Sequence, residues 1–179
     1  MYPYMVKAPQ LWSASFHATD GRAQARAITA TMWPIARSAA KALVKSHPAD
    51  LIVTVHPFAN TFALKALGKD RPPFLNVVTD MVTTHALWYD NRADLILVPT
   101  ENARRRALKY KMSPEKVKVV GLPVADKYCH PKGRKSILRK NLGWTVDKPV
   151  VLLVGGGEGM GPLAKTAAEI EAKVTEVSK

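Results

Sequence analysis

The sequence Val150-Val-Leu-Leu-Val-Gly-Gly-Gly-Glu-Gly-Met-Gly-Pro162 joins a run of aliphatic residues to a glycine-rich loop and a proline. Five consecutive aliphatic residues between Pro149 and Gly155 predict a strand that is covered on both faces, as in a parallel sheet. Pro162 suits the first turn of a helix, and apolar residues recur at helical spacing over 163–177. The stretch therefore predicts a strand, a loop and a helix in succession, which is the repeating unit of an α/β fold.

The loop of this unit is a candidate anion-binding site. Glycine adopts positive φ without strain and lets a ligand approach the backbone N–H groups closely, and the start of the next helix adds unpaired N–H groups and a favourable dipole. The loop matches neither the dinucleotide pattern G-x-G-x-x-G, because Met160 replaces the last glycine, nor the P-loop. A plain tight turn is the alternative, but a turn needs one or two glycines. We expect a phosphate or diphosphate to bind Gly155, Gly156, Gly157, Glu158, Gly159, Met160 and Gly161.

Length and composition limit the class of protein. A chain of 179 residues that is 47% hydrophobic can build one globular core or parts of two. No apolar run approaches the roughly 20 residues of a membrane-spanning helix, and residues 1–10 lack the apolar region of a signal peptide. The lone Cys129 excludes an internal disulfide and, by itself, a cysteine-based metal site. We expect a reducing, cytoplasmic environment.

The positive charge is concentrated in one part of the chain. The formal net charge is +13, and the segment from Arg104 to Lys140 holds thirteen of the 27 Lys and Arg but only two of the 14 Asp and Glu. Such segregation indicates a polyanionic partner, although a solvated helix face is the simpler alternative. Only Tyr110 and Tyr128 are aromatic there, which disfavours base stacking with nucleic acid. We therefore expect anionic membrane lipids as partners of Arg104, Arg105, Arg106, Lys109 and Lys111.

Strand and helix patterns alternate through the rest of the chain, after an irregular lead-in over residues 1–19. Helices are predicted over 22–46, with a kink or break at Pro34, and over 59–67 and 101–111, the last with Thr100 as its N-cap. Strands are predicted over 51–55, 74–78, 95–98 and 117–120. This order predicts a Rossmann-like α/β fold, with a parallel sheet and helices on both faces.

Polar residues gather where these strands end. Ligands of parallel α/β sheets bind beyond the carboxyl ends of the strands, a rule that nominates His56, Asp80, His85, Thr100 and the glycine loop together. Thr79 and Trp88 lie in the same segment as Asp80 and His85, just past the end of a strand. Asp80 and His85 are the candidate catalytic pair, because a carboxylate or an imidazole can accept the proton of an attacking hydroxyl. The alternative is that Asp80 caps a turn and His85 packs beside Trp88. For His56 a partly buried, hydrogen-bonded structural role is the more common explanation of a histidine at a strand end.

Four segments together resemble a known family. They are Val77-Val-Thr-Asp80 with His85 and Trp88, Val98-Pro-Thr-Glu101, Lys118-Val-Val-Gly-Leu-Pro-Val124, and Leu153-Val-Gly-Gly-Gly-Glu-Gly-Met-Gly-Pro162. In this order they resemble monogalactosyldiacylglycerol synthases and the related diacylglycerol glucosyltransferases of glycosyltransferase family 28. The resemblance implies a GT-B architecture of two Rossmann-like domains. Residues 1–124 would form the lipid-acceptor side without its first βα unit, 125–148 a basic connector, and 149–179 the start of the UDP-sugar domain.

The same resemblance implies a function. A hexose, galactose or glucose, would pass with inversion from a UDP-sugar to diacylglycerol, with no metal and no organic cofactor. His56, Thr79, Trp88 and Thr100 would lie on the acceptor side, and the glycine loop would approach the donor diphosphate. Since a family glycine-rich loop ending in His is not found before His17, we expect a fragment that is inactive alone. We expect it to be peripheral on the inner face of the cell membrane. A non-enzymatic basic α/β module that binds membrane or nucleic acid is the alternative.

Overall fold

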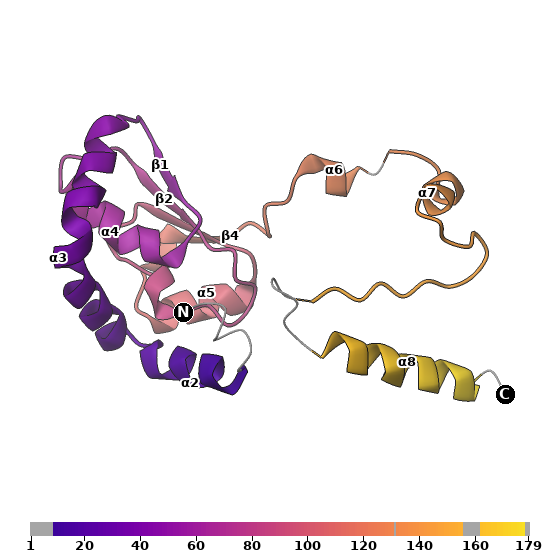
Figure 1. The fold of residues 1–179 in the computed structure, drawn as a ribbon. Helices are drawn as coiled ribbons and strands as arrows, with labels where there is room; N and C mark the ends of the chain where they lie inside the picture. The colour runs from indigo at the N-terminus through magenta and orange to yellow at the C-terminus, as the bar shows by residue number, and fades with distance from the viewer. Residues whose placement is uncertain (1–8, 131, 156–161, 178–179) are drawn as a thin grey trace. The chain divides into compact units, whose positions relative to one another are not determined.

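The computed structural model describes residues 9–130, 132–155 and 162–177 (Figure 1). The chain divides into two compact units, Ala14–Val124 and a second one made of Met1–Ser13 with Ala125–Lys179. The first contains the sheet and most of the candidate residues.

The sheet has four parallel strands, in the order in which they occur in the chain. They are β1 (Ile52–Thr54), β2 (Phe74–Val77), β3 (Leu95–Val98) and β4 (Val117–Val119). The register places Thr54 beside Asn76 and Val77 beside Leu97. The predicted α/β fold with a parallel sheet is confirmed, with strands up to two residues shorter than their apolar patterns.

One face of the sheet carries the core. Helices α4 (Pro57–Leu67) and α5 (Glu101–Lys109) and the short η1 (Ala86–Trp88) pack there, and Ala103 and Ala107 are small enough to bring α5 close. The buried cluster is Leu64, Phe74, Val78, Trp88, Ala93, Ile96, Val98, Ala103, Ala107, Met112 and Val117. Because strand order follows chain order, right-handed connections all fall on one side.

The opposite face of the sheet carries apolar side chains that these helices do not cover. Val53 is 50% exposed, Val55 at the end of β1 is 60% exposed, and Val120 after β4 is 54% exposed. The helices of the Ala14–Val124 unit that build the core lie on the face opposite these valines.

Helix α3 (Arg22–Ser46) packs against α4 and is one continuous helix through Pro34, so the predicted break is not formed (Figure 1). Proline removes one N–H from the helical ladder, which leaves the carbonyl of Ala30 without its usual donor. Both Ala30 and Pro34 are exposed. Water can therefore satisfy that carbonyl, and the helix continues.

A helix also replaces part of the predicted irregular lead-in. Helix α2 spans Pro9–Thr19, and residues 1–8 lie outside the described part of the chain. The ring of Phe16 meets the ring of His85 edge-on, with centroids 5.1 Å apart. The expectation was wrong for residues 9–19 because a tertiary contact, invisible to local periodicity, stabilises this helix.

The second unit contains helices α6 (Asp126–Cys129), α7 (Lys135–Asn141) and α8 (Leu163–Val177). The helix predicted over 163–177 is confirmed, but the strand predicted over 150–154 is not formed. Leu152 and Val154 are 70% and 80% exposed. A parallel strand needs a neighbour for its backbone hydrogen bonds, and no described segment pairs with these residues.

Candidate functional site

Asp80 lies in the loop that follows β2 and is held by a buried tryptophan. The indole Nε1–H of Trp88 donates a hydrogen bond to Asp80 Oδ2 at 2.7 Å. Trp88 is only 2% exposed, whereas Asp80 is exposed. The carboxylate is therefore fixed by one oxygen on a rigid group while it faces solvent, the arrangement that a proton acceptor for a bound hydroxyl needs.

Trp88 is itself fixed by polar side chains from the core. Its carbonyl accepts hydrogen bonds from the amide groups of Asn60, at 3.0 Å, and Asn76. The Thr54 hydroxyl donates to Asn60 Oδ1, which links β1 to the same cluster. These residues are buried, and among their side-chain polar atoms in the described structure only Asn76 Oδ1 has no hydrogen-bond partner. The cluster therefore fixes the position of the ring that holds Asp80.

His85, just before η1, has hydrogen-bond partners at both ring nitrogens. Its Nδ1 accepts from the backbone N–H of Leu87 at 3.1 Å, so the proton of the neutral ring is on Nε2, which lies 3.1 Å from the Thr19 hydroxyl. Burial lowers the pKa of His85 below its ordinary value; Asp20 and Asp80 raise it and Arg106 lowers it further. The imidazole is therefore neutral near pH 7, and both of its nitrogens are engaged within the fold.

Asp20, between α2 and α3, anchors the segment that carries His85. Its carboxylate accepts from the backbone N–H of Ala86 at 2.9 Å, from the Tyr110 hydroxyl at 2.6 Å, and from the Arg106 guanidinium. Arg106 also donates to the carbonyl of Thr84 at 2.9 Å. Three elements distant in sequence are thus joined at one carboxylate.

The protonation states in this network follow from burial and hydrogen bonding. Burial raises the pKa of Asp20, but hydrogen bonds from Tyr110, Ala86 and Arg106 outweigh it and hold that pKa below its usual range. Burial raises the pKa of Tyr89 and of Tyr110 to about 12, and the hydrogen bond to Asp20 adds to the effect at Tyr110. At neutral pH the network therefore combines the Asp20 carboxylate and the Arg106 guanidinium with the neutral phenol of Tyr110, on which the ring of Tyr89 stacks.

Sequence reasoning assigned no role to Asp20 and gave Arg106 a different one. The partners of Asp20 lie 66 to 90 residues away, so no local pattern marks them. One signal was available: Asp20 is the only acidic residue among residues 1–49, which hold six Lys and Arg. A single acid in a basic segment is a candidate for a specific ion pair.

The other nominated residues are placed around the carboxyl ends of the strands. His56 is exposed just before α4, and its ring stacks on Phe58 with centroids 6.1 Å apart. Thr79 is exposed in the loop next to Asp80. The Thr100 hydroxyl caps α5 by accepting from the N–H of Ala103 at 3.1 Å, as predicted, and donates to the carbonyl of Met81. The geometry thus joins Trp88 to Asp80 directly and ties Thr100 to the same loop.

One of the five basic residues predicted to contact anionic lipid, Arg106, belongs to this network. Arg106 forms an ion pair with Asp20, so its charge is compensated inside the fold. Arg105 bonds to Asn102 within α5, and Arg104 lies 3.9 Å from Glu101. Lys109 and Lys111 are exposed. We call Arg104, Arg105, Lys109 and Lys111 the basic patch below.

The glycine loop lies almost wholly outside the described residues, so the structure says nothing of the expected diphosphate site beyond Gly155, which is exposed. In the described ranges, no three His, Cys, Asp or Glu side chains gather as metal ligands would. No helix in that part of the chain has the length and apolar character needed to cross a bilayer.

Comparison with known proteins identifies the family. The family model described as monogalactosyldiacylglycerol (MGDG) synthase matches residues 1–124. The chain is 37% identical over 171 residues to a probable chloroplastic MGDG synthase of Glycine max and 38% identical to that of Nicotiana tabacum. It is 37% identical to the chloroplastic MGDG synthase of Spinacia oleracea. Each alignment covers 93% of this chain and 32% or 33% of the relative.

These relatives correct the expected location and show what share of their length the chain covers. They are named as chloroplastic plant enzymes, which contradicts the cytoplasmic location at the inner face of the cell membrane expected from the sequence. The chain spans about a third of the length of these curated relatives. With more than half of its residues matched by the family model, the chain belongs to the monogalactosyldiacylglycerol synthase family.

Proposed function

We propose that this chain contributes the acceptor side of a glycosyltransferase that moves galactose from a UDP-sugar to diacylglycerol, with inversion. Membership of the MGDG synthase family carries the proposal, since its relatives are named for monogalactosyldiacylglycerol. Those names favour galactose over the glucose that the sequence left open. No metal or organic cofactor is proposed.

Asp80 is the residue we propose to accept the proton. The acceptor hydroxyl oxygen would attack the anomeric carbon of the sugar from the side opposite UDP, the bond from that carbon to the UDP oxygen would break, and the hydroxyl proton would pass to the carboxylate. The hydrogen bond from Trp88 engages only Oδ2, and Asp80 is exposed, which supports this role. We assign His85 to positioning, because both of its nitrogens have partners.

The donor and membrane contacts are also part of the proposal. N–H groups of the loop Gly155–Gly161 would stabilise the charge that develops on the departing UDP. The basic patch would attract the anionic surface of the membrane that contains the acceptor. Its four cations lie on α5 or just after it, which supports a common direction of approach.

A chimeric enzyme tests the proposal. The aligned segment of the Spinacia oleracea enzyme is replaced by this chain, and the product formed from diacylglycerol and UDP-galactose or UDP-glucose is identified by mass spectrometry. We expect monogalactosyldiacylglycerol, with UDP-galactose strongly preferred. A chimera with native-like circular dichroism that forms no glycolipid, or that prefers UDP-glucose, would contradict the proposal.

A further inference from the structure

A pocket of about 430 Å³ lies in the Ala14–Val124 unit, apart from the residues assigned to transfer. It lies among the first turns of α3, the middle of α4 and the segment from Ala86 to Arg92. Pockets of this size take small organic ligands. The side chains that give it its character are Arg22, Arg26, Thr29, Lys65, Asp90 and Arg92.

The charges of this pocket do not balance. Asp90 is its one lining acid, and its carboxylate accepts from Arg92 at 2.9 and 2.6 Å and from the Thr61 hydroxyl at 2.9 Å. Burial raises the pKa of Asp90, but the bonds from Arg92 outweigh it, so this carboxylate stays ionised and neutralises Arg92. Three cations remain, from Arg22, Arg26 and Lys65.

Other acids do not compensate these cations within the described residues. Asp20 is the nearest acid in sequence to Arg22, but its carboxylate is occupied by Arg106, Tyr110 and the N–H of Ala86. No ion pair to Arg22, Arg26 or Lys65 is formed in that part of the chain. The Lys65 ammonium lies over the ring of Trp33, 5.4 Å from its centroid, which orients the cation without cancelling its charge.

The positions of Arg22 and Arg26 destabilise helix α3 when no anion is bound. Arg22 and Arg26 lie one turn apart, where like charges repel. They also occupy the N-terminal end of α3, whose first turn contains no acid, although the helix dipole favours negative charge there. A bound anion would reverse both effects.

We propose that this pocket binds the phosphate group of a small organic phosphate, either a soluble compound or a lipid headgroup. Guanidinium groups bind phosphate oxygens in pairs of parallel hydrogen bonds, and Lys65 adds a third cation from the facing helix. The pocket is much larger than a phosphate ion, so the organic part of the ligand also fits inside. The inference is independent of the proposed function, because it uses none of the residues assigned to transfer.

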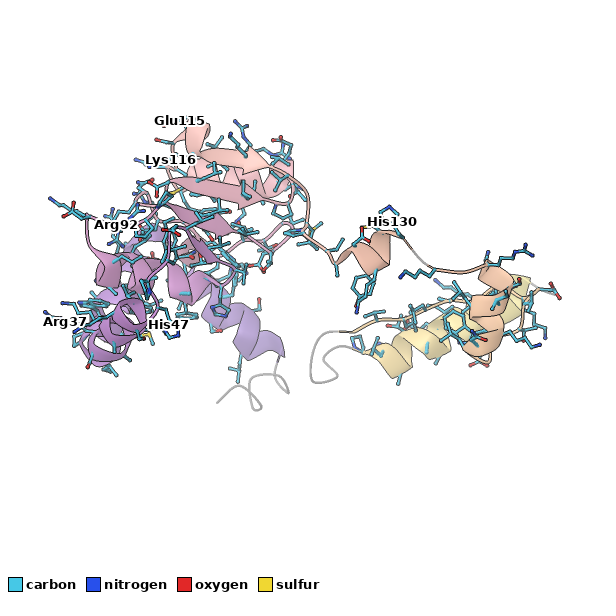
Figure 2. The ribbon with its side chains drawn as sticks, turned by 90° about the horizontal axis from the view of Figure 1, so that it is seen from above. Arg37, His47, Arg92, Glu115, Lys116 and His130 are labelled. Carbon is cyan, nitrogen blue, oxygen red and sulfur yellow. The ribbon has the colours of Figure 1, made fainter. Side chains whose placement is uncertain are left out.

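Matched charge variants of the full chain test the site. Glycerol 3-phosphate is titrated calorimetrically into the wild type, into the triple variant Arg22→Gln, Arg26→Gln, Lys65→Gln, and into the control Arg37→Gln, Lys41→Gln, Lys45→Gln. The control removes the same number of charges from exposed positions of α3 that do not line the pocket. Figure 2 labels Arg37, which the control replaces, and Arg92, which lines the pocket. Loss of charge-assisted bonds should weaken binding at least about tenfold in the pocket variant and less than about twofold in the control.

Vesicles distinguish the two sources of the phosphate. Flotation compares phosphatidylcholine vesicles with and without dicetyl phosphate. If only the pocket variant loses binding to the vesicles with dicetyl phosphate, the ligand is a lipid headgroup. If the pocket variant floats like the wild type but binds glycerol 3-phosphate more weakly, the ligand is a soluble compound. Circular dichroism checks folding, and the single variant Arg26→Gln replaces the triple one if the latter unfolds. The proposal is overturned if neither probe binds the wild type, or if control and pocket variants weaken binding equally.

Discussion

Replacing Asp20 by Asn should destabilise the Ala14–Val124 unit at neutral pH. The amide oxygen can still accept from Ala86 and Tyr110, but the charge that pairs with Arg106 is lost. The side chains of Asp20 and Arg106 are 11% and 26% exposed, so solvent screens the pair only partly. Hydrogen bonds to charged groups contribute about 1.5–3 kcal/mol, and we expect a loss of roughly 2 kcal/mol in the free energy of unfolding. At about 4 °C per kcal/mol for a unit of this size, Tm should fall by roughly 8 °C.

The pH dependence of Tm shows whether Asp20→Asn acts through the lost charge or through altered packing. The pKa of Asp20 is lowered from 3.8 in the folded state, so its contribution is fully present above that value and is lost as the pH falls through the lower, folded pKa. The difference in Tm between wild type and Asp20→Asn should therefore not shrink between pH 7 and about 5, where it widens somewhat because Asp20 also raises the pKa of His85, and it should shrink in stronger acid. The lowered pKa of His85 destabilises both proteins as the pH falls below 6.5, because the unfolded chain takes up the proton first.

Thermal unfolding followed by circular dichroism at several pH values measures both effects. Asp70→Asn is the control, since it removes one carboxylate from an exposed position. If Asp20→Asn melts within about a degree of the control at pH 7, where roughly 8 °C is expected, or if its deficit persists unchanged in strong acid, the ion pair does not stabilise the fold as argued.

Three further predictions concern function. In the chimeric enzyme, Asp80→Asn and His85→Ala should each lower kcat about a hundredfold with UDP affinity nearly unchanged; loss of UDP binding in parallel would contradict an acceptor-side role. The chain should bind anionic vesicles, more weakly in high salt and after Arg104→Ser, Arg105→Ser and Lys109→Ser together; equal binding to neutral vesicles would contradict this. The chain alone should bind UDP only weakly by calorimetry, because the described residues before its glycine loop form no strand; micromolar affinity would count against that reasoning.

Local sequence patterns predicted the strands of the sheet, a helix cap and a helix end. The apolar runs gave all four strands of the sheet, and the position of Thr100 gave the cap of α5. The helix before Gly68 ends where predicted, and this glycine has a φ of 81°. Each of these signals depends on neighbours within a few residues, so a single sequence contains it.

The errors share a different physical origin. Helix α2 is stabilised by Phe16 against His85, across 69 residues of sequence. The aliphatic run at 150–154 has the composition of a strand, but a strand forms only with a partner, and no described segment provides one. The sequence placed Arg106 in a basic surface, but its guanidinium forms an ion pair with Asp20. In all three cases a contact between distant residues, or its absence, decided the outcome.

The position of Asp80 is also decided by distant contacts. Its loop, from Val78 to His85, contains little regular structure of its own, and the sequence alone allows the carboxylate many positions. Trp88 restricts it, because the indole N–H donates to Asp80 while the carbonyl of the same residue accepts from Asn60 and Asn76. At the other end of the loop, Asp20 binds the N–H of Ala86. Buried polar groups of three strand and helix elements thus fix one exposed carboxylate, which is what catalysis by a positioned base requires.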